Sequence, residues 1–176
     1  MRPQSAGLEG GSCRICLGGV EMSKHFSIEE FTASDMALRR RIDNSLPEVL
    51  ADNANRTLDM LERIRAYLST VAGKDIPVYI SSGYRSPKLN EAVGGVPSSD
   101  HVKGMAADIK APAFGSPLKV AQTLAQVVND LDIGQLINEY PGAGGWVHVS
   151  TRRPDKQVNR IITITAQGAQ VGIKEA

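Results

Sequence analysis

The sequence has few cysteines, few aromatic residues and no long apolar run. Cys13 and Cys16 are its only cysteines, so a disulfide framework is excluded for the rest of the chain. A lone C-x-x-C could be half of a zinc site or a redox pair, but no second pair follows it and no strand pattern precedes it. No segment is long and apolar enough to suggest insertion in a membrane.

An excess of charge of one sign is also missing. The chain has 20 basic and 19 acidic residues, and its basic residues cluster only at Arg39–Arg41 and at Arg152-Arg153. Proteins that bind nucleic acids need a basic surface that neutralises phosphates, so this class of partner is excluded. The three consecutive arginines are interpreted as the solvated end of a helix.

A length of 176 residues suits one domain that folds without disulfides. Residues 1–21 are predicted to be a disordered N-terminal extension, residues 22–166 the domain, and residues 167–176 a C-terminal tail. The opening segment lacks the apolar core of about 7–15 residues that signal peptides contain. We therefore expect synthesis in the cytoplasm without a signal peptide.

Periodicity and capping signals predict an α+β fold. Ser27 and Glu30 form a capping box, which predicts a short helix that frays over 32–42. Apolar residues at helical spacing predict a long helix over 46–73 and another over 116–134. The apolar face of the long helix comprises Leu50, Ala54, Leu58, Leu61, Ile64, Leu68 and Val71. The predicted strands are 76–82, 106–111, 135–140, 146–150 and 160–165. Because helices and strands do not alternate regularly, we expect a mostly antiparallel sheet with helices packed on it.

Three side chains could together bind a metal ion. His101 and Asp108 are separated by a reversal at Gly104, and His148 lies in the strand pattern WVHVS. Two imidazoles and one carboxylate are suitable ligands for one zinc ion that keeps a position for water. The same residues are also compatible with hydrogen-bonded core positions, whereas His25 is assigned to the surface.

At these residues the sequence resembles the zinc D-Ala-D-Ala carboxypeptidase and L-alanyl-D-glutamate endopeptidase family, in particular its short phage and prophage members. The resemblance covers about Phe26 to Ser150. The motifs that carry it are SGYRSP (82–87), Asn90, VGG (93–95), S-x-H-x-x-G-x-A-x-D (99–108) and WVHVS (146–150). It implies a Hedgehog/DD-peptidase fold, one zinc ion, and hydrolysis of peptidoglycan stem peptides by a metal-activated water.

The resemblance also implies roles for individual residues. His101, Asp108 and His148 match the zinc ligands. Arg85 matches an active-site arginine that is suited to a substrate carboxylate or an oxyanion, although it could instead hold the glycine-rich loop. Ser99, Tyr84 and Trp146 are assigned to substrate binding, and Asn90 to the architecture of the loop.

The catalytic base is predicted at a different position from the one that many relatives use. Many relatives place a carboxylate three residues before the last histidine, where this chain has Gly145. Glu139, nine residues before His148, is the nearest candidate. In an antiparallel hairpin it shares a face with His148 only if it lies opposite an even-numbered residue such as Trp146. We therefore predict a four-residue turn over 141–144, or a bulge.

A serine peptidase is rejected as an alternative function. SPLK (116–119) fits the S-x-x-K pattern of serine peptidases, but the K-T-G and S-D-N partners are missing, and Ser116 with Pro117 is typical of a helix start. A non-catalytic, zinc-stabilised module that binds cell wall or forms part of a phage is the other alternative.

We expect a monomer that acts at the cell wall after release, or within a virion. The sequence does not predict which peptide bond is cut.

Overall fold

The computed structural model describes residues 23–141 and 144–175. The predictions for residues 1–21, including the Cys13 and Cys16 pair, lie outside the described residues. Within the described part of the chain, no helix combines the length and apolar character needed to cross a membrane.

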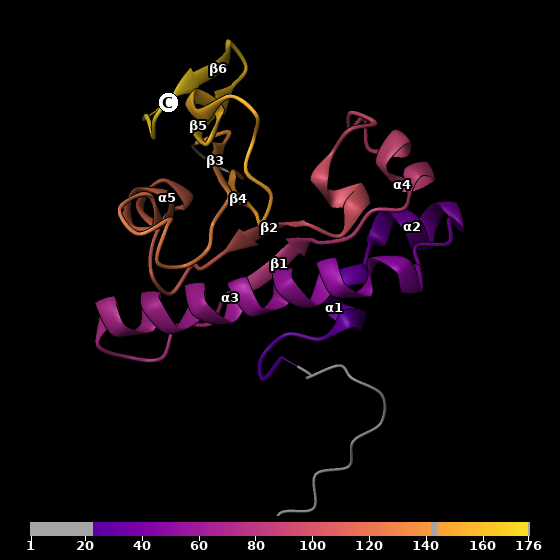
Figure 1. Cartoon of the computed structure of the whole chain (residues 1–176), viewed down its shortest axis with the longest axis horizontal. Helices are drawn as coiled ribbons and strands as arrows, with labels where there is room; N and C mark the ends of the chain where they lie inside the picture. Colours follow the sequence, from indigo (N-terminus) through magenta and orange to yellow (C-terminus); the bar gives the residue numbers. More distant parts are fainter. Residues whose placement is uncertain (1–22, 142–143, 176) are drawn as a thin grey trace, which may run out of the picture.

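A six-stranded mixed sheet forms the centre of the molecule (Figure 1). Its strands are β1 (Tyr79–Ser82), β2 (Ala106–Lys110), β3 (Gln135–Glu139), β4 (Trp146–Ser150), β5 (Ile161–Thr165) and β6 (Gly168–Val171). They lie in the order β1-β2-β4-β3-β5-β6, and only β3 and β5 pair in parallel. The predicted α+β class with a mostly antiparallel sheet is therefore confirmed.

Apolar residues on one side of the central strands pack against the helices α3 (Ala51–Ala72) and α5 (Pro117–Ala125). Ile109 of β2 lies directly opposite Val147 of β4, and both are fully buried. Leu61 of α3 and Leu124 of α5 belong to the same core cluster. Since neighbours along a strand point to opposite faces, Asp108 and His148 point away from this core. The fold thus leaves one face of β2 and β4 for a site.

The long helix α3 buries most of the predicted apolar face. Its buried members are Ala54, Leu58, Leu61, Ile64 and Leu68. Leu50 precedes α3 in the short 3-10 helix η1 (Glu48–Leu50) and is half-buried. Val71 is 52% exposed, so its prediction as a core residue is wrong. The buried face of α3 ends about one turn before the C-terminal end of the helix, which stops at Gly73 as predicted.

Two substitutions in α3 test this assignment. Leu61→Ala should lower the free energy of unfolding by about 2–5 kcal/mol, because it opens a cavity in the core. Val71→Ala, in the same helix but exposed, should change it by no more than about 0.5 kcal/mol. Urea unfolding of both variants measures the difference. Equal losses would contradict the burial described for the two side chains.

The N-terminal helices differ from their prediction. Ser27 caps α1 (Ile28–Thr32) by accepting a hydrogen bond from the Glu30 amide, at 3.1 Å. Instead of fraying, the chain then forms α2 (Asp35–Arg40), which has its own cap, Ser34. Arg39–Arg41 are exposed at the end of α2, which confirms their interpretation as a solvated helix end.

The helix predicted over 116–134 is shorter in the structure. α5 ends at Ala125, and the chain continues in turns to Asp132, which has a φ of 57°. Val128 and Leu131 are buried in these turns. The apolar spacing therefore predicted their burial correctly, but not the helix. At the other end, Ser116 accepts a hydrogen bond from the Lys119 amide as the cap of α5. This contact confirms the interpretation of SPLK as a helix start.

The C-terminal segment is part of the sheet. Residues 167–176 are predicted to be a tail, but β6 pairs with β5 from Ile162↔Val171 to Thr165↔Gly168. Beyond β6, the Lys174 amide donates to Thr163 Oγ1 at 2.8 Å. The prediction of a tail is therefore wrong for residues 168–171, whose order comes from pairing with a neighbouring strand.

Candidate metal centre and cleft

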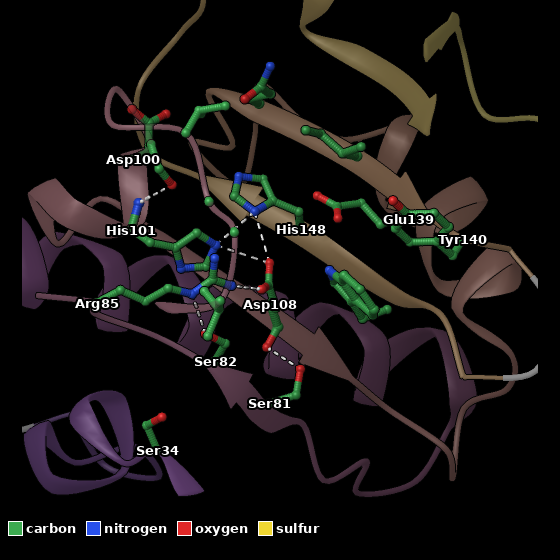
Figure 2. Close-up of a pocket in the computed structure, with 18 of the residues that line it drawn as sticks. Ser34, Ser81, Ser82, Arg85, Asp100, His101, Asp108, Glu139, Tyr140 and His148 are labelled. Carbon is green, nitrogen blue, oxygen red and sulfur yellow. Dashed lines mark hydrogen bonds and ion pairs between the residues drawn. The ribbon is translucent and has the colours of Figure 1, made fainter. Parts of the chain in front are cut away.

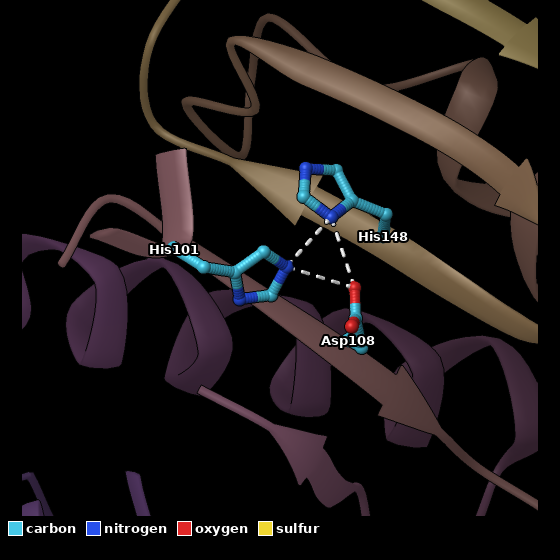
Figure 3. A group of neighbouring side chains, drawn as sticks. All are labelled: His101, Asp108 and His148. Carbon is cyan, nitrogen blue, oxygen red and sulfur yellow. Dashed lines mark hydrogen bonds and ion pairs between the residues drawn. The ribbon is translucent and has the colours of Figure 1, made fainter. Parts of the chain in front are cut away.

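Three buried side chains from separate elements meet at one point (Figure 3). Asp108 of β2 and His148 of β4 are direct cross-strand neighbours, and His101 projects from the 3-10 helix η2 (Asp100–Lys103). His148 Nδ1 lies 2.9 Å from Asp108 Oδ1. His101 Nε2 lies 3.2 Å from each of these two atoms. The structure thus brings together the three residues that the sequence singles out.

This set of donors fits a zinc ion. Two imidazoles and one carboxylate are ligand types found in catalytic zinc sites. Atoms held about 2.0–2.1 Å from one ion in a tetrahedron are separated by roughly 3.3 Å. The observed separations of 2.9 and 3.2 Å are close to that value. The cluster can therefore hold one ion after only small shifts of the side chains.

The orientation of His101 is fixed by the ends of η2 and by a contact with the loop at Gly83. Ser99 caps η2, and Gly104 ends it with a φ of 68°, the reversal that the sequence predicts. His101 Nδ1 lies 2.6 Å from the Gly83 carbonyl oxygen. Because this oxygen can only accept, the ring proton sits on Nδ1 and leaves the Nε2 lone pair facing the cluster.

Gly83 is required where this carbonyl approaches His101. A Cβ at this position would lie 2.1 Å from the Phe31 carbonyl oxygen. The Tyr84 amide donates to the same oxygen at 2.8 Å, so the loop is held against α1. The glycine in SGYRSP therefore allows the close approach that positions the partner of His101.

Arg85 is bound to the second oxygen of Asp108. Its Nη2 donates to Asp108 Oδ2 at 2.6 Å, and its Nε donates to Ser82 Oγ at 2.8 Å. Asp108 thus directs one oxygen to the imidazoles and the other to the guanidinium. Burial alone would raise the pKa of Asp108, but the charge of His101 and the hydrogen bonds of both imidazoles lower it far below its usual range. The carboxylate is therefore ionised, as a metal ligand must be.

The two imidazoles have opposite pKa shifts. Burial lowers the pKa of His101, against the opposing effect of Asp108. Burial also acts to lower the pKa of His148, but the hydrogen bond and charge of Asp108 outweigh it and the pKa is raised. A proton and a metal ion compete for the same nitrogen. Protonation of His148 therefore opposes metal binding in acid.

Glu139 lies on the cleft face, in the register that the hairpin argument requires. It is directly opposite Trp146, and Ile137 is opposite His148. Figure 2 shows its carboxylate reaching from β3 toward His148. Burial and then the charge of Asp108 raise the pKa of Glu139, while His148, Arg85 and the Trp146 indole oppose the rise. The predicted register is confirmed, although the turn includes residues 142–143, which lie outside the described part.

The cluster and Glu139 line an open cleft with a volume of about 830 Å³. Arg85, Lys110 and Arg152 contribute cationic groups to its wall. Apolar groups come from residues 93–96 and from Tyr140 and Trp146. The aromatic rings of Tyr140 and Trp146 are 5.6 Å apart and tilted by 51°. A peptide could bind along the sheet with polar and apolar contacts on both sides of the cluster.

Of the other predicted site residues, some line the cleft and some do not. Ser99 and Trp146 line the cleft. Tyr84 does not, because its side chain is 3% exposed and packs in the hydrophobic core, so we do not retain it as a substrate contact. Asn90 Nδ2 donates to the Val96 carbonyl at 2.9 Å, which agrees with a role in the loop. His25 pairs with Glu62 on the surface, away from the cleft.

A second buried carboxylate, which the sequence did not indicate, lies beside the cluster. Asp100 precedes His101, and its side chain is 4% exposed. Asp100 Oδ1 accepts from Arg152 Nε at 2.6 Å, and Oδ2 accepts from Ser150 Oγ at 2.9 Å. These bonds join η2 to the end of β4, and so join the elements that carry His101 and His148. The position of Asp100 between the motif residues Ser99 and His101 was the only feature of the sequence that could have indicated this role.

Loss of this contact should destabilise the protein. Asp100→Ala is expected to lower the free energy of unfolding by about 1–3 kcal/mol, because the buried Ser150 hydroxyl loses its acceptor, whereas Arg152 is 37% exposed and can be solvated. Asp132→Asn removes the charge from an ion pair with Arg63 in which both side chains are exposed, the aspartate to 77% and the arginine to 42%, so this control should cost no more than about 1 kcal/mol. Urea unfolding would contradict the assignment if the two variants were equally stable.

A buried His-Asp-His cluster in a cleft, faced by a glutamate, is typical of zinc-dependent hydrolases. The family description Peptidase M15 matches residues 24–150, and the chain belongs to this family. No curated protein matches the chain. M15 peptidases are zinc-dependent, so membership implies a metallopeptidase. The matched residues include the three candidate ligands, Arg85 and Glu139, and agree with the extent of the sequence resemblance.

Proposed function

We propose that this metallopeptidase hydrolyses peptide bonds in peptidoglycan stem peptides, as a D,D-carboxypeptidase or an L-alanyl-D-glutamate endopeptidase. The observation that carries the proposal is the convergence of His101, Asp108 and His148 in an open cleft beside Glu139. The sequence resemblance supports the choice of substrate. A bound zinc ion would supply Lewis acidity, which polarises a carbonyl and makes water a better nucleophile near neutral pH.

The remaining roles would fall to this chain's own side chains. His101, His148 and Asp108 would hold the ion. Glu139 accepts the proton of the attacking water and passes it to the amine that leaves, a role for which its raised pKa is suited because proton transfer is most efficient near the operating pH. Removal of this proton shuttle typically costs about 10²–10⁴-fold in rate.

Arg85 has two tasks in this scheme. Its contact with Asp108 Oδ2 orients the carboxylate, and the remaining guanidinium donors can stabilise the negative charge that develops on the substrate oxygen. Ser99 and Trp146, at the cleft wall, are proposed to contact the peptide. The partner is thus a cell-wall peptide. We propose a monomer that reaches it after release from the cell or as part of a virion.

Mass spectrometry of purified muropeptides incubated with the protein tests the proposal. Loss of a terminal D-alanine identifies a carboxypeptidase, and cleavage between L-alanine and D-glutamate identifies an endopeptidase. A chelator should stop either reaction, and a β-lactam should not. Binding to insoluble peptidoglycan without any cleavage would contradict the peptidase and identify a non-catalytic wall-binding module.

A further inference from the structure

The indole of Trp146 carries a buried hydrogen-bond donor that needs an acceptor. Within residues 23–141 and 144–175, Trp146 Nε1 is buried and has no hydrogen-bond partner. An unpaired buried donor costs free energy, so such a group calls for a specific explanation. The nitrogen is shielded from solvent although the residue as a whole is half-buried. A substrate could therefore reach it only after a side chain moved.

Glu139 is the acceptor that the geometry favours. It lies directly opposite Trp146 in the β3–β4 pair. In the described part of the chain, its carboxylate takes part in none of the side-chain hydrogen bonds or ion pairs, whereas both oxygens of Asp108 are already used. The Trp146 indole acts to lower the pKa of Glu139, although its N–H does not meet ordinary hydrogen-bond geometry.

We propose that the indole N–H of Trp146 is the donor that positions the Glu139 carboxylate for proton transfer. A small rotation of the carboxylate completes the hydrogen bond through one oxygen and leaves the other directed toward the cleft. The ring of Tyr140 packs at 5.6 Å from the indole and limits its movement. This role of Trp146 rests on the proposed function of Glu139, and makes Trp146 a positioning residue rather than only a wall of the cleft.

Nuclear magnetic resonance tests the contact without any measurement of activity. Trp146 is the only tryptophan in the chain, so a ¹⁵N-labelled sample gives one indole N–H signal. Glu139→Ala removes the acceptor and should move the indole proton signal upfield. Glu139→Gln should move it upfield by less, because an amide oxygen still accepts a hydrogen bond, although a weaker one than a carboxylate accepts. Glu91→Gln, the same change at an exposed residue, should leave it in place. An unchanged signal in Glu139→Ala would overturn the proposal.

Kinetics separate this role from a contact with substrate. Trp146→Phe keeps an aromatic ring but removes the donor. We expect kcat to fall by about tenfold or more, as for loss of a hydrogen bond to a charged group, with KM unchanged. A raised KM with an unchanged kcat would overturn the proposal and assign the indole to substrate binding. If the wild-type protein cleaved no peptide while its indole signal still responded to Glu139, the contact would stand and the peptidase function would fail.

Discussion

Replacement of His148 by alanine is expected to abolish stable zinc binding and peptide hydrolysis together. The variant leaves the ion only His101 and Asp108 as protein ligands, and catalytic zinc sites need three. Changes to groups that merely support a ligand lower metal affinity by about 10–100-fold, so loss of a ligand should lower it by at least about 100-fold. Elemental analysis after dialysis, and titration of the metal-free protein with zinc, measure this loss.

His25→Ala is the matched control, because His25 lies outside the cleft and pairs with Glu62. It should keep one zinc ion per chain and the wild-type rate. Circular dichroism of both variants checks that the fold is retained. A folded His148→Ala protein that binds zinc as tightly as the wild type would show that the ion is held elsewhere.

Glu139→Gln is expected to keep the metal and lose turnover. Glutamine has nearly the same shape as glutamate but cannot accept the proton of water. Since general acid and base catalysis contributes about 10²–10⁴-fold, kcat should fall by that factor. Zinc content and the unfolding midpoint should stay close to those of the wild type, because Glu139 is not among the three clustered ligands. Muropeptide hydrolysis and elemental analysis, made on the same sample, test both parts.

Glu91→Gln provides the control for this change, since Glu91 is exposed and does not line the cleft. It should hydrolyse peptides at the wild-type rate. Hydrolysis by Glu139→Gln at a similar rate would mean that another group takes the proton, and would also remove the reason for a positioning role of Trp146.

Local patterns predicted much of the site. The WVHVS strand alternates, so its valines point to the core while Trp146 and His148 point to the cleft. The same period of two, applied across the hairpin, predicted that Glu139 must lie opposite Trp146. These predictions succeeded because they depend on backbone geometry within a few residues.

Predictions failed for two reasons. The strand β6 directly follows β5 and pairs with it, but glycine and alanine make up two of its four residues and are poor strand formers, so the sequence shows no strand pattern there. The other failures depend on a distant segment or on packing. Asp100 and Arg152 are 52 residues apart, and their contact depends on where η2 meets the end of β4. Tyr84 follows a motif glycine but turns into the core, which its sequence position does not reveal.

The sequence by itself determined which residue types could bind a metal, which faces of the strands are apolar, and where α1 and α5 begin. These properties follow from side-chain chemistry and from the periods of helix and strand. Only the tertiary structure decided that Arg85 binds Asp108 and that Asp100 joins the two ligand-bearing elements. Such contacts join groups far apart in the chain, and their distances depend on how the whole sheet and its helices pack.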